Sequence, residues 1–290
     1  MTLTIFTPTY NRAYTLDNLY KSIIAQTNKN FEWIIIDDGS TDNTRELIDN
    51  WIKEGKINIK YFCQSNGGKH RAINKGVKEA EGDLFFIVDS DDCLTPDAVD
   101  WIIANSKEIL QNNNFGGISG IKIYPDGTKV GGGSDFGLID SNMIDIRLKY
   151  NIAGDMAEVF KTSVLKEFPF PEIDGEKFCP EALIWFRIAR KYKMRFVHKG
   201  IYVCEYLPDG LTAKITRIRR ESPVASMIFY SEHFHDNISL KWKIKAAINF
   251  WRFQKADYKK GYDMINLLSI LSWLPGKLMG WRDSKKLSAE

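Results

Sequence analysis

Residues 84–92 read Leu-Phe-Phe-Ile-Val-Asp-Ser-Asp-Asp, so a run of five apolar residues is followed at once by a turn rich in aspartate. A short apolar run without polar interruption is typical of a strand that is buried on both faces of a parallel sheet. Ligands of such sheets bind beyond the carboxyl ends of the strands. The stretch therefore predicts a buried strand over residues 84–88 with a functional segment directly after it.

The surrounding residues alternate short apolar runs with segments of helical periodicity. The predicted strands are residues 3–7, 33–36, 57–62 and 84–88. The predicted helices are residues 16–24, 44–53, 69–80 and 96–110. This alternation predicts an α/β fold with a mostly parallel sheet that is flanked by helices.

The pattern changes after residue 114. Further strands are predicted over residues 118–124 and 195–203, and a further helix over residues 181–191. Residues 221–290 have helical spacing and many aromatic side chains. We therefore expect a helical appendage at the C-terminal end.

The composition is that of an ordinary globular protein, with 44% hydrophobic and 27% charged residues in a chain of 290. Its four cysteines form no C-x-x-C pair, which argues against a zinc knuckle or a redox motif and fits a reducing cytoplasm. Residues 1–6 show no basic segment leading into a long apolar run, so we expect no secretory signal there.

The charge is distributed unevenly along the chain. The overall formal charge is +3, but residues 239–290 hold 11 Lys and Arg against 4 Asp and Glu, which leaves residues 1–238 net negative. A negative N-terminal part argues against a partner that is a nucleic acid. The cationic tail predicts contact with an anionic membrane surface, so we place the protein in the cytoplasm at the inner face of the cell membrane.

Four polar clusters follow the four predicted strands. They are TPTYNR at residues 7–12, DDGS at 37–40, NGGKHR at 66–71 and DSDD at 89–92. The carboxyl ends of parallel strands lie at one edge of the sheet, so we expect these clusters to converge on one rim.

The aspartates of the fourth cluster offer hard oxygen ligands. Asp89, Asp91 and Asp92 lie on one turn, and carboxylates of this kind suit Mg²⁺ or Mn²⁺, whose coordination is completed by substrate phosphates and water. The cluster predicts a site for a divalent cation and a diphosphate.

The other clusters offer groups that recognise a nucleotide. Gly68 allows close approach of the backbone, while Lys69 and Arg71 bring positive charge to phosphate oxygens. Tyr10 can stack on a base, and Asp38 can accept a hydrogen bond from an imino N–H such as that of uracil.

Each cluster taken alone has a simpler explanation. An acidic cluster before a helix often serves as a cap, and Asp-Gly-Ser and Asn-Gly-Gly are common in turns. A single tyrosine such as Tyr10 more often packs than stacks on a base. The occurrence of all four at strand ends within one alternating unit favours a functional site.

In order, the motifs PTYNR at 8–12, DDGSTD at 37–42, NGGK at 66–69 and DSDD at 89–92 resemble glycosyltransferase family 2 of the bacterial polysaccharide and glycolipid type. The resemblance implies the GT-A fold, with a catalytic domain over residues 1–220 and a basic, aromatic helical region over residues 221–290. It implies an inverting transfer from a nucleotide-diphosphate sugar, with a UDP-sugar expected, to a hydroxyl of a saccharide or lipid-linked acceptor.

The resemblance also implies roles for single residues. The donor-binding residues that it implies are Pro8, Tyr10, Arg12, Asp38, Asn66, Gly68, Lys69, Arg71 and Asp89. The ligands of Mn²⁺ or Mg²⁺ that it implies are Asp91, Asp89 and Asp209. The bound metal would offset the charge on the departing UDP.

The general base is harder to assign. The family usually carries a Glu-Asp pair at the start of a later helix, and here Glu181 is followed by Ala182. Glu181 is the candidate base, and an equally weighted alternative is a first-turn glutamate that is favoured by the helix dipole. Asp155 resembles a residue on the acceptor side, with a turn residue as its alternative, and His198 is expected to be structural.

The C-terminal region allows two interpretations. Residues 241–253 mix basic and aromatic side chains, and the apolar residues 264–274 are too few to span a bilayer as a helix. The segments are therefore expected either to lie in a membrane interface or to pack on the catalytic domain.

Other functions fit the sequence less well. The first strand is not followed by G-x-G-x-x-G, and Gly68-Lys69 is not followed by Ser or Thr, which argues against a nicotinamide-dependent enzyme and a P-loop NTPase. A metal-dependent phosphohydrolase leaves Tyr10 and Asp38 unexplained. A non-catalytic nucleotide-sugar-binding or membrane scaffold protein stays open, because Ala182 replaces the second acid.

Overall fold

The computed structural model describes residues 1–132, 135–205, 214–254 and 267–287. The chain divides into two compact units. Unit 1 comprises Met1–Phe170 and Arg187–Glu205, and unit 2 comprises Pro171–Phe186 and Tyr206–Glu290. These units reflect packing alone, and the division into a catalytic domain over residues 1–220 and an appendage over 221–290 stays a prediction.

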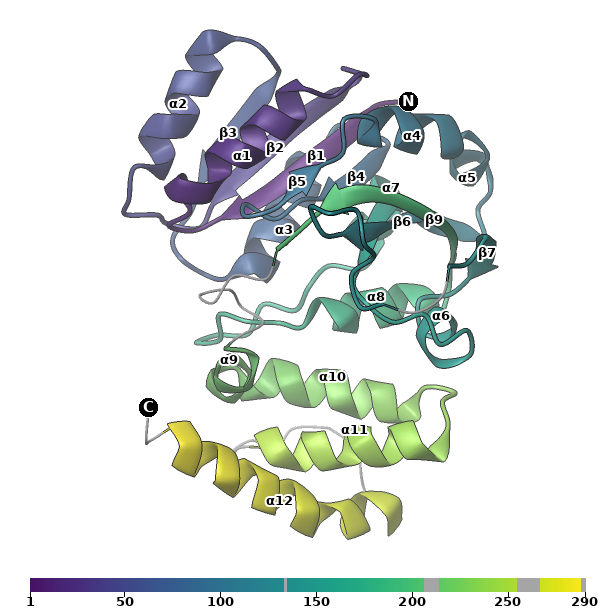
Figure 1. Ribbon diagram of the computed structural model, residues 1–290. Helices are drawn as coiled ribbons and strands as arrows, with labels where there is room; N and C mark the ends of the chain where they lie inside the picture. The colour runs from purple at the N-terminus through teal and green to yellow at the C-terminus, as the bar shows by residue number, and fades with distance from the viewer. Residues whose placement is uncertain (133–134, 206–213, 255–266, 288–290) are drawn as a thin grey trace. The chain divides into compact units, whose positions relative to one another are not determined.

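The described residues of unit 1 form a nine-stranded sheet (Figure 1). The strands lie in the order β3-β2-β1-β4-β8-β6-β9-β5, and β7 pairs with β9. Their bounds are β1 Leu3–Thr9, β2 Phe31–Asp37, β3 Ile59–Cys63, β4 Leu84–Ile87, β5 Cys93–Leu94, β6 Phe115–Ile123, β7 Leu138–Ser141, β8 Met156–Lys161 and β9 Lys193–Val203.

Strand direction divides the sheet into two parts. The strands β3, β2, β1 and β4 are parallel throughout, as their apolar composition predicts. Strand β8 enters antiparallel between β4 and β6, and β6 pairs in parallel with β9. The predicted α/β sheet is therefore present, with its parallel character concentrated in the N-terminal strands.

Helices connect and cover these strands. The helices of unit 1 are α1 Ala13–Ile24, α2 Thr44–Glu54, α3 Lys69–Glu79, α4 Ala98–Asn105, α5 Lys107–Gln111, α6 Asp145–Leu148 and α7 Thr162–Glu167, and α8 Glu181–Ala189 runs from unit 2 into unit 1. The single helix predicted over residues 96–110 is wrong in one respect: it is two helices, because the chain bends at the fully buried Ser106.

The apolar core of unit 1 explains the placement of the helices. Leu16 of α1 and Val99 of α4 are fully buried in one cluster with the inward residues of β1 and β2. Within this cluster Trp51 stacks on Tyr20 with ring centroids 4.3 Å apart. Helix α3 covers the opposite face, where a Cβ on Gly76 would come within 2.2 Å of the Phe6 ring.

The described part of unit 2 is helical. Its remaining helices are α9 Ile215–Glu221, α10 Pro223–His235, α11 Leu240–Phe253 and α12 Leu267–Leu287. A small core forms where Met227 and Phe234 of α10 meet Ala247 and Phe250 of α11. Among the residues that the structure describes, no helix has the length and apolarity needed to cross a membrane.

Candidate functional site

The four polar clusters begin at one edge of the parallel strands. In the register of the sheet Thr9 lies beside Asp37, and Asp37 lies beside Cys63, so β1, β2 and β3 end together. The pairing of β1 with β4 continues to Val88, whose N–H donates to the carbonyl of Phe6 at 2.8 Å. The residues that follow each strand therefore share this edge, as parallel pairing requires.

Asp38 organises the third cluster. Its Oδ1 accepts hydrogen bonds from Gln64 Nε2 at 2.8 Å and from the N–H of Gly67 at 2.9 Å. Its Oδ2 accepts from the N–H of Gly68 at 2.7 Å and from Asn66 Nδ2 at 3.3 Å. The carboxylate is thus occupied by four donors of one loop, a role that its position in the sequence did not reveal.

The first cluster is fixed to the second. Asn11 adopts a left-handed backbone with φ of 51°, which asparagine tolerates. Its N–H donates to Ser40 Oγ at 2.8 Å, and its Oδ1 accepts from the N–H of Thr41 at 2.8 Å. One residue after Arg12, the N–H of Ala13 donates to Asp42 Oδ2 at 3.1 Å. These bonds hold the segment around Arg12 against the loop after β2.

Two cations from other clusters reach the aspartates that follow β4. Lys69 Nζ lies 2.5 Å from Asp89 Oδ1, and Arg12 Nη2 lies 3.9 Å from Asp91 Oδ2. The structure therefore brings together four of the predicted residues from three different strand ends.

Asp92 has partners that the sequence did not suggest. Tyr202 of β9 donates its hydroxyl hydrogen to Asp92 Oδ2 at 2.7 Å and accepts the N–H of Asp89 at 2.9 Å. Lys122 of β6 places its Nζ 3.8 Å from Asp92 Oδ2 and 4.0 Å from the centre of the Tyr202 ring. Lys122 and Tyr202 therefore hold the acidic turn from strands β6 and β9.

The charges in this cluster shift the pKa of each carboxyl group. Burial opposes ionisation of Asp89, but the ammonium groups of Lys69 and Lys122 outweigh it and lower the pKa of Asp89. Burial, together with the charge of Asp89, raises the pKa of Asp91 and raises that of Asp92 to about 7. Burial is the larger cause of both raised pKa values, and the charge of the neighbouring Asp89 adds to it.

This donor set fits a hard divalent cation. Asp89 and Asp91 present carboxylate oxygens on one turn, close to the cations of Lys69 and Arg12. Within the described ranges, no group of three or more His, Cys, Asp or Glu residues is arranged to hold a metal ion. A site with two carboxylates corresponds to Mg²⁺-type sites that substrate phosphates complete.

The other predicted donor residues lie along the same edge. Pro8 is buried within β1 opposite Ile36, whereas Tyr10 is 48% exposed just beyond the strand. Arg71 donates from Nη1 to the carbonyl of Gly67 at 2.9 Å, so it supports the loop that Asp38 holds.

The acceptor and base candidates lie in different parts of the chain. Asp155 is exposed just before β8, and its charge contributes to raising the pKa of Lys122. Glu158 on β8 was missed by the sequence analysis, and burial raises its pKa to about 7. Glu181 is the first residue of α8, in unit 2. Asp209 and the rest of the loop 207–212 lie outside the described residues.

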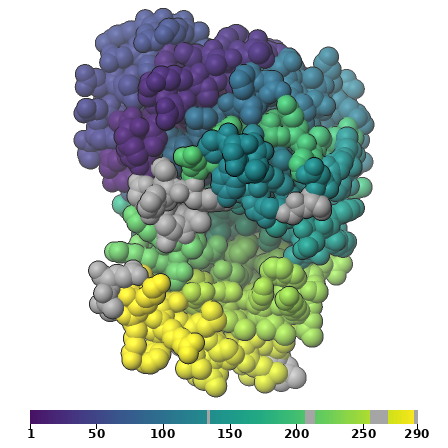
Figure 2. Space-filling view, in the orientation of Figure 1, coloured from purple at the N-terminus to yellow at the C-terminus, as the bar shows by residue number. Residues whose placement is uncertain are grey.

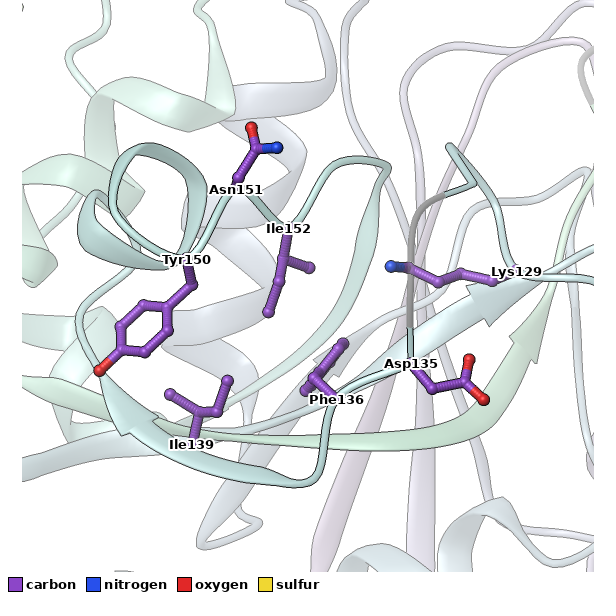
Figure 3. A pocket seen from close by; sticks show the side chains of 7 residues that line it. All are labelled: Lys129, Asp135, Phe136, Ile139, Tyr150, Asn151 and Ile152. Carbon is purple, nitrogen blue, oxygen red and sulfur yellow. The ribbon is translucent and has the colours of Figure 1, made fainter.

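A pocket of about 250 Å³ lies elsewhere in unit 1. Figure 3 shows its lining side chains, which come from residues 129–152. The Lys129 ammonium has no hydrogen-bond partner there, and burial lowers its pKa. The wall residue Asp135 lies 3.0 Å from Nε2 of His198, which also accepts the N–H of Phe136 at Nδ1. These contacts are consistent with a structural role for His198.

Comparison with known proteins identifies the N-terminal part. Residues 4–124 match the model of glycosyl transferase family 2. An uncharacterized glycosyltransferase of Rickettsia conorii is 38% identical over 39% of this chain and 18% of its own length. The GalNAc(5)-diNAcBac-PP-undecaprenol beta-1,3-glucosyltransferase of Campylobacter jejuni is 29% identical over 69% of this chain and 63% of its own. The chain thus spans less than a fifth of the Rickettsia relative.

Solved structures share the fold. Staphylococcus aureus TarS 1–349 in complex with UDP-GlcNAc superposes with a TM-score of 0.66 at 18% identity, covering 95% of this chain and 79% of that one. A mannosyltransferase from Pyrobaculum calidifontis in complex with GDP-Man and Mn²⁺ superposes with a TM-score of 0.57 at 16% identity, over 96% of this chain and 73% of that one. The predicted GT-A fold is confirmed, and residues 4–124 of this chain are similar to glycosyl transferase family 2.

Proposed function

We propose that this chain transfers a sugar from a UDP-sugar to a hydroxyl group of a saccharide or lipid-linked acceptor, with inversion at the anomeric carbon. The observation that carries the proposal is the acidic turn after β4, where Arg12 and Lys69 from two other strand ends meet Asp91 and Asp89. Cations and paired carboxylates at one strand edge suit a diphosphate that is bound together with a metal ion.

The donor lies along the edge from Tyr10 to the acidic turn. Tyr10 is exposed beyond β1 and stacks on the base, while Pro8 fixes the strand beneath it. Asp38 has both carboxylate oxygens occupied by the loop 64–68, so its contribution to uracil recognition includes positioning Asn66 and Gly68. Lys69 and Arg71 bring positive charge to the diphosphate.

Asp91, with Asp89 beside it, holds Mn²⁺ or Mg²⁺, and Asp209 is a further candidate ligand. The bound ion supplies positive charge that stabilises the departing UDP. Support for a metal comes from the carboxylate pair itself and from the Mn²⁺ in the complex of the Pyrobaculum mannosyltransferase.

Glu181 acts as the general base. It accepts the proton of the acceptor hydroxyl while that oxygen forms a bond to the anomeric carbon. The bond from this carbon to the UDP oxygen breaks on the opposite side, so a single displacement inverts the configuration. The first-turn position of Glu181 in α8 also fits a purely structural glutamate, and its substitution decides between the two roles.

The acceptor binds on the side of Asp155. The name of the Campylobacter relative includes an undecaprenol-linked saccharide, which supports an acceptor of polysaccharide or glycolipid assembly. We place this assembly at the cytoplasmic face of a membrane because residues 239–290 are cationic. Asp155 is exposed and contributes to raising the pKa of Lys122, which supports its candidacy for a contact with an acceptor hydroxyl.

The test is release of UDP from a panel of UDP-sugars in the presence of Mn²⁺. We expect at least one donor to be turned over, and Asp91→Asn to lower the rate by about 100-fold or more, because it removes charge that is needed in the transition state. Asp17→Asn is the matched control: Asp17 forms an exposed pair with Lys21 on α1, and its loss should leave the rate unchanged. If no donor is turned over, the proposal fails.

Glu181→Gln separates binding from transfer. The variant should bind UDP as the wild type does and lose transfer by about 100-fold or more, as expected for loss of a general base. Glu46→Gln, an exposed glutamate in the first turn of α2, is the control. Unchanged turnover by Glu181→Gln would leave only its structural role.

A further inference from the structure

Helix α12 packs on α11 through its small residues. Gly276 and Gly280 are buried, and a Cβ on either would lie 2.6 Å from the Ile248 carbonyl oxygen or 2.8 Å from that of Arg252. Ser269 is also fully buried, and its carbonyl accepts the indole N–H of Trp251 at 2.8 Å. The inward face of α12 is therefore made of glycine and serine rather than of large apolar side chains.

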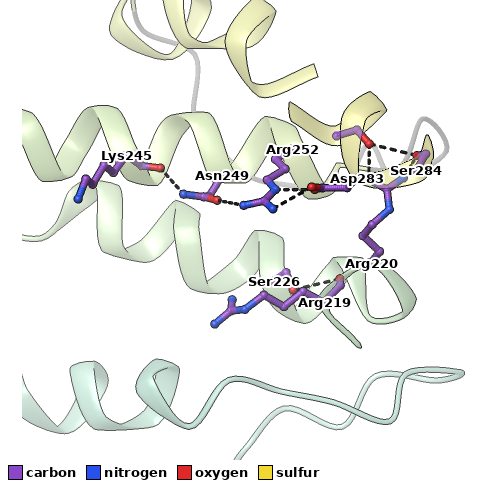
Figure 4. Close-up of polar contacts among 9 residues, drawn as sticks. Arg219, Arg220, Ser226, Lys245, Asn249, Arg252, Asp283 and Ser284 are labelled. Carbon is purple, nitrogen blue, oxygen red and sulfur yellow. Dashed lines mark hydrogen bonds and ion pairs between the residues drawn. The ribbon is translucent and has the colours of Figure 1, made fainter. Parts of the chain in front are cut away.

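Polar contacts fix this orientation (Figure 4). Arg252 of α11 forms a bidentate pair with Asp283 of α12, at 2.6 and 3.0 Å. Arg220 of α9 donates to the carbonyl of Gly280 at 2.7 Å and also bonds Ser284. Rotation of α12 that would bury its outer face would break both sets of contacts.

The large apolar side chains of α12 point outward instead. Ile270, Leu271, Leu274, Leu278 and Trp281 recur at spacings of three and four residues, so they lie on one face. They are 59, 66, 57, 53 and 56% exposed, and α12 lies at the surface in Figure 2. A surface helix of a soluble protein normally turns its large apolar side chains toward the core and its small polar ones toward water. Helix α12 has the opposite arrangement, so its outer face requires an apolar partner.

The exposed residues of α12 change from apolar to basic along the helix. Between Leu268 and Trp281 every exposed residue is apolar, since Lys277 is only half-exposed and donates to Gln254 Oε1 at 2.8 Å. Arg282, Lys285 and Lys286 then follow and are exposed. The apolar face thus ends in a group of cations.

We propose that this outer face of α12, defined by Ile270, Leu271, Leu274, Leu278 and Trp281, inserts into the surface of an anionic lipid membrane, with the cations at 282–286 on the headgroups. This inference extends the proposed function, in which the acceptor is lipid-linked and lies at a membrane. The observations that support it come from unit 2 alone.

The charge of helices α11 and α12 favours a lipid membrane, rather than a second copy of the chain, as the partner of this face. Helices α11 and α12 carry eight Lys and Arg in their described residues and one acid, Asp283, which Arg252 already pairs. The same face of a second copy would offer these cations no acidic partner. An anionic bilayer offers hydrocarbon for the apolar face and phosphate for the cations, and tryptophan favours the boundary between the two.

Helix α11 does not provide this surface, although its sequence is also aromatic and basic. Its Phe250 and Phe253 are buried, and Ala246 and Ala247 face the small core of unit 2. Packing therefore accounts for much of the apolar content of residues 241–253, and the unpaired apolar surface is on α12.

Co-sedimentation of the full chain with phosphatidylcholine vesicles, with and without phosphatidylglycerol, tests the proposal. The wild type should sediment with the anionic vesicles. Leu274→Gln with Leu278→Gln should lower the partition coefficient about tenfold or more, because two apolar side chains no longer enter the bilayer. Ile52→Gln with Leu138→Gln, which changes residues 42 and 59% exposed in unit 1, should sediment as the wild type does.

A second pair tests the headgroup contact. Lys285→Gln with Lys286→Gln should reduce binding to the anionic vesicles about tenfold or more at low salt, since each cation near such a surface contributes to attraction. Lys78→Gln with Lys107→Gln, exposed lysines of unit 1, is the control with the same change of charge.

Three outcomes would overturn the proposal. In the first, the wild type stays in solution in the presence of anionic vesicles. In the second, the α12 double variant and the control double variant lose binding equally. In the third, the wild type does not bind vesicles, and the α12 double variant converts a dimer to a monomer on gel filtration. Quenching of tryptophan fluorescence by brominated lipid provides a reading on the unaltered fold, and it should fall in Trp273→Phe with Trp281→Phe. UDP release is assayed without vesicles. A failure of vesicle binding therefore leaves the transferase proposal intact, and a failure of UDP release leaves the membrane proposal intact.

Discussion

Asp38 has an unusually complete set of hydrogen-bond donors for one carboxylate. It is 4% exposed and accepts from two backbone N–H groups and two side-chain amides of residues 64–68. When a buried acceptor is removed, its former donors stay without a hydrogen-bond partner, which lowers the free energy of unfolding by about 1–3 kcal/mol. The loop that carries Gly68 therefore depends on this single side chain.

We predict that Asp38→Asn lowers the free energy of unfolding by about 1–3 kcal/mol, because its NH₂ group would face donors rather than accept from them. Denaturant unfolding measures the loss, and calorimetric titration should show weaker binding of UDP. Asp100→Asn, an exposed aspartate of α4, is the control. Equal stability of the two variants would show that the loop holds its shape without Asp38.

Glu158 predicts a dependence of stability on pH. Burial raises the pKa of Glu158 to about 7, from a value of about 4.5 in the unfolded chain. The folded state then binds more protons than the unfolded state between these values, so the contribution is full below pH 4.5 and is lost as the pH rises to about 7.

Glu158→Gln should remove this dependence. Relative to the wild type, the thermal midpoint of the variant should rise as the pH increases from about 4.5 to about 7. Glu79→Gln, a helix-surface change in α3, serves as the control, and a constant difference between the wild type and Glu158→Gln across the range would refute the assignment.

The sequence predicted the acidic turn and its two cations, but it did not predict the residues that hold the turn from other strands. Asp89, Asp91, Arg12 and Lys69 were found because each follows a recognisable apolar strand. Lys122 and Tyr202 are single polar residues inside strands, and Tyr202 bonds Asp92 across 110 positions. No local pattern marks such partners, because the pairing of β9 with β6 and with β5 brings them to the turn.

At the scale of elements, α12 illustrates how close packing depends on glycine. A Cβ added at Gly276 would lie 2.6 Å from both the Ile248 carbonyl oxygen and Trp251 Cβ, and neither atom belongs to the flexible end of a side chain. Gly276→Ala should therefore push α12 away from α11 and lower the thermal midpoint. The expected loss is about 1–3 kcal/mol, in the range of overpacking.

Gly137→Ala is the matched control for this prediction. An added Cβ at Gly137 meets nothing within 4 Å, so differential scanning calorimetry should find its midpoint unchanged. A Gly276→Ala variant as stable as Gly137→Ala would mean that α12 is not held against α11 at this distance.

The elements themselves were predicted unevenly. In the alternating N-terminal part every predicted strand was found, with bounds that differ by up to two residues, because buried parallel strands are rich in apolar residues. The helix predicted over residues 96–110 was the exception, since it is two helices. Strand β7, with the pattern exposed, intermediate, exposed, buried, carries no such signal. Strand β8 enters the sheet antiparallel between β4 and β6, an order that periodicity along the chain does not encode.

At the scale of the whole molecule, charge and composition anticipated two different parts. The net negative residues 1–238 contain the parallel strands and the acidic turn, and the cationic residues 239–290 contain the helix with the outward apolar face. Packing yields a different division from composition, since residues 171–186 belong to unit 2. Glu181 lies in that segment, so the assignment of the base depends on kinetics rather than on the fold of unit 1.

A crystal structure of the full chain with UDP and Mn²⁺ tests the central claim most directly. The proposal predicts an anomalous peak for manganese at bonding distance from an Asp91 oxygen and from the diphosphate, with the base of UDP on Tyr10. Manganese and nucleotide found elsewhere, for example in the pocket at Lys129, or bound without contact to the turn after β4, would contradict it.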